Sequence, residues 1–128
     1  MTKTEKQKLG RKGEDAAAAY LKNKGHVILK RNYRVGRTEL DIVSLDGETL
    51  VVSEVKSYFT PPPEGAEFRV DQRKQRNIIR GTNGFLQQHP QYEQAAVRFD
   101  VLVVDFSRYP ARVIHHEEAF WADSGWEE

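Results

Sequence analysis

The chain has 128 residues, with 20 Lys and Arg against 19 Asp and Glu, and no cysteine. That length fits a single domain, predicted to span residues 1–128 with a core at about 8–106 and a C-terminal extension at 107–128. Without cysteine, disulfides, thiolate metal sites and a cysteine nucleophile are excluded. No apolar stretch is long enough to span a bilayer and no signal-peptide pattern is present, so we expect a cytoplasmic protein with no membrane partner.

The basic charge is concentrated in two segments of the chain. Residues 1–40 hold eleven Lys and Arg against four Asp and Glu, and residues 69–80 hold five basic residues against one acid. Such segments favour a nucleic acid, in particular DNA, as partner, because phosphate neutralisation releases condensed counterions. Two ordinary solvated helix faces would give the same distribution, so the charge alone leaves both interpretations open.

The first predicted element is a helix from Lys6 to Asn23. Its apolar and small residues recur at helical spacing: Leu9, Gly13, Ala16, Ala17, Tyr20 and Leu21. At 100° per residue Glu14 lies at the edge of this stripe, so we expect its carboxylate to lean toward the core. Gly10 and Gly13 each cost about 1 kcal/mol relative to Ala inside a helix, which indicates that another element or a ligand approaches closely there.

The rest of the chain alternates strand and helix patterns. Strands are predicted at 27–33, 38–45 and 49–56, with a proline-rich loop at 60–65. A helix at 70–88 and a strand at 97–106 follow, then a short strand at 112–114 and a helical turn at 117–121. Both faces of the second and third strands are apolar, so helices are expected on both sides of the sheet. The order α-β-β-β-α-β therefore predicts an α/β protein.

The Asp-Gly pair at 46–47 predicts a hairpin and sets its register. A two-residue turn there would place Leu45 opposite Glu48. Asp41 and Glu54 would then lie on a diagonal, about 7–8 Å apart at the backbone. Alternation along both strands gathers four charged side chains on one face of the sheet: Glu39, Asp41, Glu54 and Lys56.

Two carboxylates at that spacing favour a hard cation, because like charges on a half-buried face need a positive charge among them. We expect Mg²⁺ or Mn²⁺ as cofactor, held by Asp41, Glu54 and the backbone carbonyl of Val55. Lys56 would orient or help to deprotonate the attacking water, or stabilise the charge that develops on a scissile phosphate. With Glu14 as a fourth candidate catalytic residue, this set predicts phosphodiester hydrolysis. A surface ion pair worth about 0–1 kcal/mol is the alternative for Glu54 and Lys56 alone.

Phosphate contacts are predicted at two helices. Arg73, Lys74, Gln75 and Arg76 begin the second helix, where basic groups add to the positive end of the helix dipole. Arg11 and Lys12 of the first helix belong to the same predicted nucleic-acid surface, with a solvated face as the alternative. The four histidines show no spacing suited to a shared metal site and are interpreted as structural or surface residues: His26, His89, His115 and His116. Asp100 is interpreted as a paired structural acid.

Six segments, in order, resemble the YraN-like family of uncharacterised bacterial proteins over residues 8–105: 10–14, 31–34, 38–43, 53–56, 74–76 and 98–101. Asp41 followed by Glu54-Val55-Lys56 is similar to the PD-(D/E)xK signature of the restriction-endonuclease-like superfamily, and Glu14 resembles the extra acid of archaeal Holliday-junction resolvases. The resemblance implies a restriction-endonuclease-like core with a mixed sheet flanked by helices. It also implies a metal-dependent endonuclease acting on DNA, including branched or junction DNA.

The chain departs from that family at three places, one of which is the pair Gly81 and Gly84 in a helix that is usually alanine-rich there. Thr38 stands where the family typically has Gly, and residues 57–59 lack the Arg that typically follows Glu-Val-Lys. Two other classes of function stay open: a nucleic-acid-binding or assembly module without turnover, and a homo-oligomeric interaction protein, such as a homodimer, that uses the apolar tail. Asp41, Glu54 and Lys56 favour the enzyme, because a pure binding module gains little from clustered acids that face phosphate.

Overall fold

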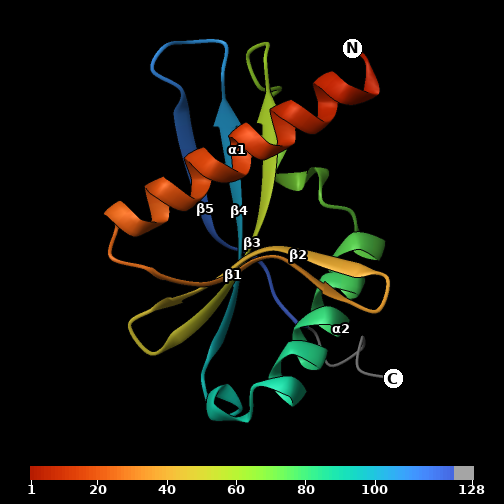
Figure 1. Ribbon diagram of the computed structural model, residues 1–128, viewed down its shortest axis with the longest axis vertical. Coiled ribbons are helices and arrows are strands. Elements are labelled where there is room, and N and C mark those ends of the chain that lie inside the picture. Colours follow the sequence, from red (N-terminus) through yellow and green to blue (C-terminus); the bar gives the residue numbers. More distant parts are fainter. Residues whose placement is uncertain (123–128) are drawn as a thin grey trace.

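A five-stranded mixed sheet carries one long helix on each face in the computed structural model, which describes residues 1–122 (Figure 1). The strands follow the order β1-β2-β3-β4-β5, with β3 and β4 parallel and the other neighbouring pairs antiparallel. This arrangement confirms the predicted α/β class and the mixed sheet flanked by helices. The elements are α1 (Lys3–Asn23), β1 (Val27–Val35), β2 (Thr38–Asp46), β3 (Thr49–Tyr58), α2 (Gln72–Gln88), β4 (Val97–Asp105) and β5 (Arg112–Phe120), with 3-10 turns η1 (Ala66–Arg69) and η2 (Pro90–Tyr92).

Both long helices begin at side-chain caps. The Thr2 hydroxyl accepts the Glu5 N–H at 3.1 Å, so α1 starts three residues before the predicted Lys6. The Asp71 carboxylate accepts the Lys74 N–H at 2.8 Å and starts α2. Each cap satisfies an N–H group that has no partner within its helix. Within residues 1–122, neither helix combines the length and the apolar character needed to cross a membrane.

The sheet is buried on both faces around its centre. One hydrophobic cluster packs against each face, and both clusters use residues of the central strands, which explains why β3 and β4 have nearly continuous apolar runs. On the α1 face, the buried residues are Ala17, Ala18, Leu21, Ile42, Leu102 and Val104. On the α2 face, they include Leu40, Val43, Leu50, Val52, Ile78, Phe85, Val101 and Val103.

The β2–β3 hairpin forms, but its predicted register is wrong by two residues. Asp46 pairs with Thr49, so the turn consists of Gly47 and Glu48 instead of residues 46–47. Gly47 adopts φ +62° at the first turn position, which an L side chain rarely adopts. Asp46 stays in the ladder, where Arg98 Nη1 donates to its carboxylate at 3.1 Å. A shift of two residues preserves alternation, so the paired residues of the hairpin keep the face that the sequence predicted. Beyond the ladder the alternation is broken, because Leu40 packs on the α2 face with Val43 while Ile42 packs on the α1 face.

The segment at 117–121, predicted as a helical turn, belongs largely to strand β5, so that prediction is wrong. Phe120 pairs with Phe99 of β4, and their rings stack with centroids 5.1 Å apart. The register shifts between Phe99 and Val101, and Glu118 has φ +50°. This bulge interrupts the two-residue alternation by which a strand is identified from sequence. β5 joins the sheet although it lies in the predicted C-terminal extension.

A buried polar network surrounds Asp100, which is fully buried and paired as predicted. Arg98 donates two hydrogen bonds to its carboxylate, at 2.9 and 3.0 Å. His115 Nε2 lies 2.7 Å from the same carboxylate, and the Glu118 N–H donates to it at 3.1 Å. Burial opposes ionisation of Asp100, but these hydrogen bonds lower its pKa below the ordinary value. The network joins β4 to β5 and has a structural role.

Helix α1 comes closest to the sheet at Gly13. A Cβ at Gly13 would lie 1.7 Å from Ser57 Oγ and 2.9 Å from Ser57 Cβ on β3. A Cβ at Gly10 would meet no atom within 4 Å. The close approach predicted for these glycines is therefore found with β3 at Gly13, whereas Gly10 faces open space.

We expect Gly13→Ala to lower the free energy of unfolding by about 1–3 kcal/mol, because the added methyl group overpacks the α1–β3 contact. Gly10→Ala is the matched control and should raise it by up to about 1 kcal/mol, since Ala favours the helix. Denaturant unfolding followed by circular dichroism measures both variants. Equal stability of the two would contradict the contact.

Candidate active site

The site begins where β2 separates from β3. The β2–β3 ladder runs from Asp46–Thr49 to Ile42–Ser53. At the next position the Val55 N–H donates to Asp41 Oδ2 at 2.9 Å. A side-chain oxygen of β2 thus takes the place of a backbone acceptor, and the strands diverge without leaving that N–H unpaired. This fork holds the Asp41 carboxylate against β3.

Glu54 meets Asp41 at the fork, as the predicted sharing of one face implied. The Glu54 side chain is 7% exposed, and its carboxyl group is within hydrogen-bond reach of the Asp41 carboxyl group. Burial, and then the contact with Glu54, raise the pKa of Asp41 to about 8, while the Val55 N–H and Lys74 act in the opposite direction. Asp41 is half-buried and Glu54 is buried, and two carboxyl groups in contact at such a place cannot both ionise cheaply. Without a cation, the pair therefore retains a proton at neutral pH.

One of the predicted phosphate-binding residues reaches this pair. Lys74, in the first turn of α2, places Nζ 3.8 Å from Glu54 Oε2. Its side chain is 46% exposed, so the ammonium group lies between the buried Glu54 carboxyl group and the solvent. Gln75 instead donates from Nε2 to the Val70 carbonyl at 2.8 Å, which holds the segment before α2. Of these neighbours, Lys74 approaches the acids and Gln75 supports the backbone.

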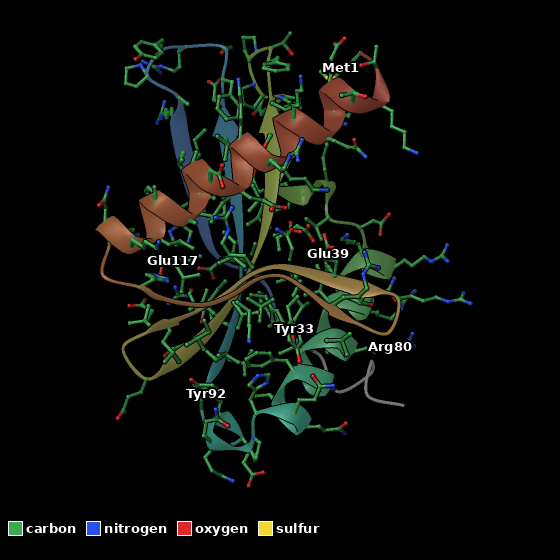
Figure 2. All side chains as sticks on the ribbon, viewed as in Figure 1. Met1, Tyr33, Glu39, Arg80, Tyr92 and Glu117 are labelled. Atoms are coloured by element: carbon green, nitrogen blue, oxygen red, sulfur yellow. The ribbon has the colours of Figure 1, made fainter. Side chains whose placement is uncertain are left out.

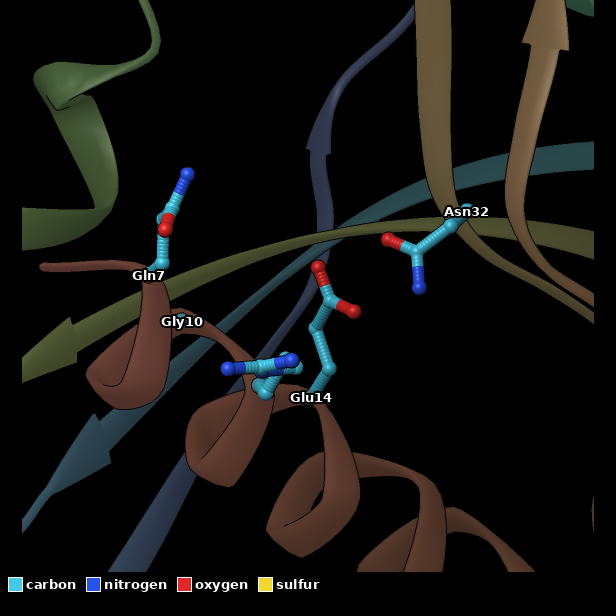
Figure 3. Close-up of a pocket in the computed structure, with 5 residues that line it drawn as sticks. Gln7, Gly10, Glu14 and Asn32 are labelled. Carbon is cyan, nitrogen blue, oxygen red and sulfur yellow. The ribbon is translucent and has the colours of Figure 1, made fainter. Parts of the chain in front are cut away.

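Glu14 approaches from α1, on the opposite face of the sheet from α2. Figure 3 shows its carboxyl group pointing away from the helix, with Asn32 of β1 facing it. Burial raises the pKa of Glu14, as do the charges of Asp41 and Glu39, while a hydrogen bond with Asn32 and the charge of Arg31 lower it. The Asp41 charge therefore acts on Glu14, although the two side chains come from different layers.

A hollow of about 400 Å³ opens beside Glu14 (Figure 3). Gln7, Gly10, Arg11 and Asn32 also line it. The open space at Gly10 is part of this hollow, so the absence of a side chain there keeps the approach to Glu14 wide.

Lys56 and Val55 continue the site along β3. Lys56 lies two residues beyond Glu54 and therefore on the same face, where it is half-buried. It forms no ion pair with any other residue in the described range 1–122. Val55 donates its N–H to Asp41, and its side chain packs with the cluster on the α1 face. Glu39, predicted on the same face, pairs instead with Arg34 of β1 at 3.3 Å; in Figure 2 it lies where the β1–β2 hairpin passes between the helices.

The other predicted phosphate contacts are spread over two helices. Arg11 is exposed and lines the Glu14 hollow, whereas the exposed Lys12 lines a different hollow beside Phe59. Arg73 is exposed and Arg76 is half-buried on α2. The basic side chains thus flank the fork on both sides and do not form one continuous stripe.

Sequence reasoning missed Asn32 as a site residue. It has φ +51° inside β1, a conformation that Asn tolerates better than most residues. This conformation accompanies the approach of its amide to Glu14. An Asn within a strand pattern was the available signal.

The acids at the fork form a pair and not a larger cluster. Among residues 1–122, no three His, Asp or Glu side chains are grouped closely enough to hold a metal ion by themselves. Any cation at the fork would therefore rely on two carboxylates together with backbone, solvent or substrate oxygens, an incomplete protein shell of the kind that Mg²⁺ accepts.

The fold and this fork define an α/β protein with a pair of carboxyl groups in contact where β2 and β3 of a mixed sheet diverge. The chain belongs to the Uncharacterised protein family UPF0102, whose family model matches residues 13–104. UPF0102 is the YraN-like family that the sequence motifs resemble, so the resemblance predicted from the sequence is confirmed.

Relatives in this family match most of the chain. A UPF0102 protein of Anaeromyxobacter dehalogenans is 42% identical, in a match that covers 92% of this chain and 87% of the chain of that relative. One of Prosthecochloris aestuarii is 40% identical, covering 90% and 94%. Among solved structures, that of Pyrococcus furiosus SfsA in complex with Ca²⁺ aligns with TM-score 0.31 and 17% identity, over 88% of this chain and 63% of that chain. Similarity at that level supports no conclusion about function.

For the metal-free protein, we expect Asp41→Asn to raise the melting temperature by an amount that depends on pH. The folded-state pKa of Asp41 is raised to about 8, so its ionisation costs the wild type stability as pH rises from about 4 toward that value. Asn has no such cost.

The difference between variant and wild type should therefore widen up to about pH 8 and then level off. Thermal unfolding in EDTA at several pH values measures it, with the exposed turn variant Glu48→Gln as control. A difference that does not change with pH would contradict the shared proton.

Proposed function

We propose that this chain is a nuclease, dependent on Mg²⁺ or Mn²⁺, that hydrolyses phosphodiester bonds in DNA. The proposal rests on the buried contact between Asp41 and Glu54, at a fork flanked by basic side chains. Strongly shifted acids occur preferentially at functional sites, because their environment is arranged for chemistry at some cost in stability. Branched and junction DNA form the substrate class to test first, given the approach of Glu14 from the first helix.

The residues at the fork suit a hard divalent cation. The pair favours a positive charge, because two adjacent carboxylates repel each other and the pKa of Asp41 is raised to about 8. Its donors are oxygens, which Mg²⁺ and Mn²⁺ prefer, and Asp41, Glu54 and the Val55 carbonyl would hold the ion. When bound, the ion would supply Lewis-acid stabilisation of the phosphate and a more acidic water.

The chain's own side chains supply the remaining functions. Lys56, half-buried on the face of Glu54, would stabilise negative charge on the scissile phosphate. Lys74 balances the charge of Glu54 from α2 and would turn to phosphate once a cation occupies the pair. Glu14 would orient a water molecule with its carboxyl group, which the hydrogen bond with Asn32 holds in place. The exposed Arg11, Lys12 and Arg73 and the half-buried Arg76 would contact the phosphate backbone.

A binding or assembly module without turnover is the second candidate. It is favoured by the small size of the acidic group, since no three ligating side chains converge within the described part of the chain. In that case Lys74 neutralises Glu54 permanently, and the basic side chains bind nucleic acid without cutting it. A homodimer in the cytoplasm is compatible with either candidate and belongs to the proposal.

We expect Asp41→Asn and Glu54→Gln to abolish cleavage, because each removes a ligand's charge and nearly preserves its shape. Lys56→Ala should also stop cleavage but leave Mn²⁺ affinity largely intact, since an ammonium cannot ligate a metal ion. Cleavage of linear, single-stranded, flapped and four-way-junction DNA, with parallel calorimetric titration of Mn²⁺, measures both effects.

The matched control is Glu48→Gln, which removes an exposed acid at the β2–β3 turn and should cut like the wild type. DNA binding should persist in the Asp41 and Glu54 variants. A wild type that cuts no DNA or RNA form with either metal, or three site variants that cut normally, would remove the nuclease and leave the binding module.

A further inference from the structure

A second hollow lies beyond the C-terminal ends of the inner strands β3 and β4. There the end of β3 and the β4–β5 loop project past α1 (Figure 1). Its volume is about 450 Å³. It is distinct from the Glu14 hollow, because none of its lining residues is shared with it. We call it the aromatic–basic hollow, and its main lining residues are Lys12, Phe59, Phe106, Arg108 and Tyr109.

The aromatic rings of this hollow are unusually accessible. Phe59 is 47% exposed and Tyr109 is fully exposed. The Phe59 and Phe106 rings are tilted by 54° with centroids 6.3 Å apart, so they do not cover each other face to face. Exposed aromatic side chains grouped in a concave site are typical of binding surfaces, because their faces remain available to a flat ligand.

The charge around these rings is positive. Lys12 and Arg108 are both exposed, and none of the lining residues in the described chain is acidic. The nearby Asp105 carboxylate accepts hydrogen bonds from the Ser107 N–H at 2.8 Å and from its hydroxyl at 2.5 Å. Its negative charge is offset by Arg108 and Arg112, and its side chain does not line the hollow. A ligand that combines a flat aromatic face with an anionic group matches both properties of the hollow.

We propose that the aromatic–basic hollow binds an unpaired nucleotide of a nucleic-acid strand. The base stacks on Phe59 and Tyr109, and the adjoining phosphates contact Lys12 and Arg108. Base–aromatic stacking combined with basic side chains is how proteins hold single strands without reading their sequence. A duplex cannot use the rings in this way, because its bases are already stacked and paired.

The position of the hollow gives it a role in the function proposed above, on which this part of the inference rests. Phe59 lies five residues beyond Glu54 along the chain, about 17 Å at 3.3 Å per residue of a strand. Lys12 of α1 lines the hollow, so it lies on the α1 side of the sheet, from which Glu14 reaches the fork. That separation corresponds to about five stacked nucleotides at 3.4 Å each. A strand held in the hollow would therefore be anchored a few nucleotides from the carboxylate pair, which selects substrates with an unpaired segment.

Fluorescence anisotropy with a labelled oligothymidine, in EDTA so that no cleavage occurs, tests the proposal. We expect Tyr109→Ala and Phe59→Ala each to weaken single-strand binding by about tenfold and to leave binding of a blunt duplex unchanged. Phe68→Ala is the matched control, because Phe68 is 77% exposed and lies outside the hollow. Tyr109 is fully exposed, so its removal leaves the core intact.

Two further measurements separate stacking from charge. A 2-aminopurine in the strand should lose fluorescence on binding to the wild type and to Phe68→Ala, but not to Tyr109→Ala. Lys12→Gln and Arg108→Gln should each reduce the slope of log affinity against log salt by about 0.7. Thymidine monophosphate should compete only weakly, because a free nucleotide lacks the neighbouring phosphates.

Single-strand binding that is equal in Tyr109→Ala, Phe59→Ala and Phe68→Ala would overturn the proposal. Competition by thymidine monophosphate as strong as by the strand would also overturn it, by making the hollow a free-nucleotide site. Failure of the nuclease proposal looks different. Ring-dependent single-strand binding without cleavage by Mg²⁺ or Mn²⁺ would contradict that proposal alone, and cleavage with ring-independent binding would contradict this one alone.

Discussion

The candidate site depends on one hydrogen bond, from the Val55 N–H to the Asp41 carboxylate. The bond lies where β2 leaves β3, and it replaces a backbone acceptor that the diverging strand no longer provides. It therefore allows the sheet to split without an unpaired buried N–H, whose cost is comparable to that of a lost hydrogen bond. It also holds one oxygen of Asp41 toward β3, so that the carboxyl group meets Glu54. The same contact thus satisfies the backbone and builds the acidic pair.

The fork also explains how groups from both faces of the sheet reach one place. α2 packs on the face that contains Glu54, and its first turn brings Lys74 to the pair. α1 packs on the other face, and the close contact at Gly13 places the following residue, Glu14, near the strands. Where the sheet is continuous, its strands would separate these two helices. Where it divides, the charge of Asp41 acts on Glu14.

A comparison of the buried acids shows why the Asp41–Glu54 pair is the functional candidate. Asp100 is more deeply buried, yet Arg98, His115 and a backbone N–H satisfy its charge, and its pKa falls. Asp41 faces another carboxyl group, and its pKa rises. Both acids are costly to bury, but the charge of Asp100 is fully compensated within the fold. The Val55 N–H and Lys74 compensate Asp41 only in part, so its pKa stays raised.

The sequence by itself determined the local features: the two long helices, the first four strands, and the side of the sheet on which Glu54 and Lys56 lie. These follow from periodicity and alternation, and the two-residue error in the hairpin register left them unchanged because alternation has a period of two. Only the tertiary structure decided which turn closes the hairpin, since Arg98 of β4 holds Asp46 in the ladder. It also decided that the bulged segment at 117–121 pairs with β4, and that Asp41 meets Val55, Lys74 meets Glu54 and Asn32 meets Glu14. Each of these depends on partners distant in the chain, and the packing of α1 and α2 on a divided sheet brings them together.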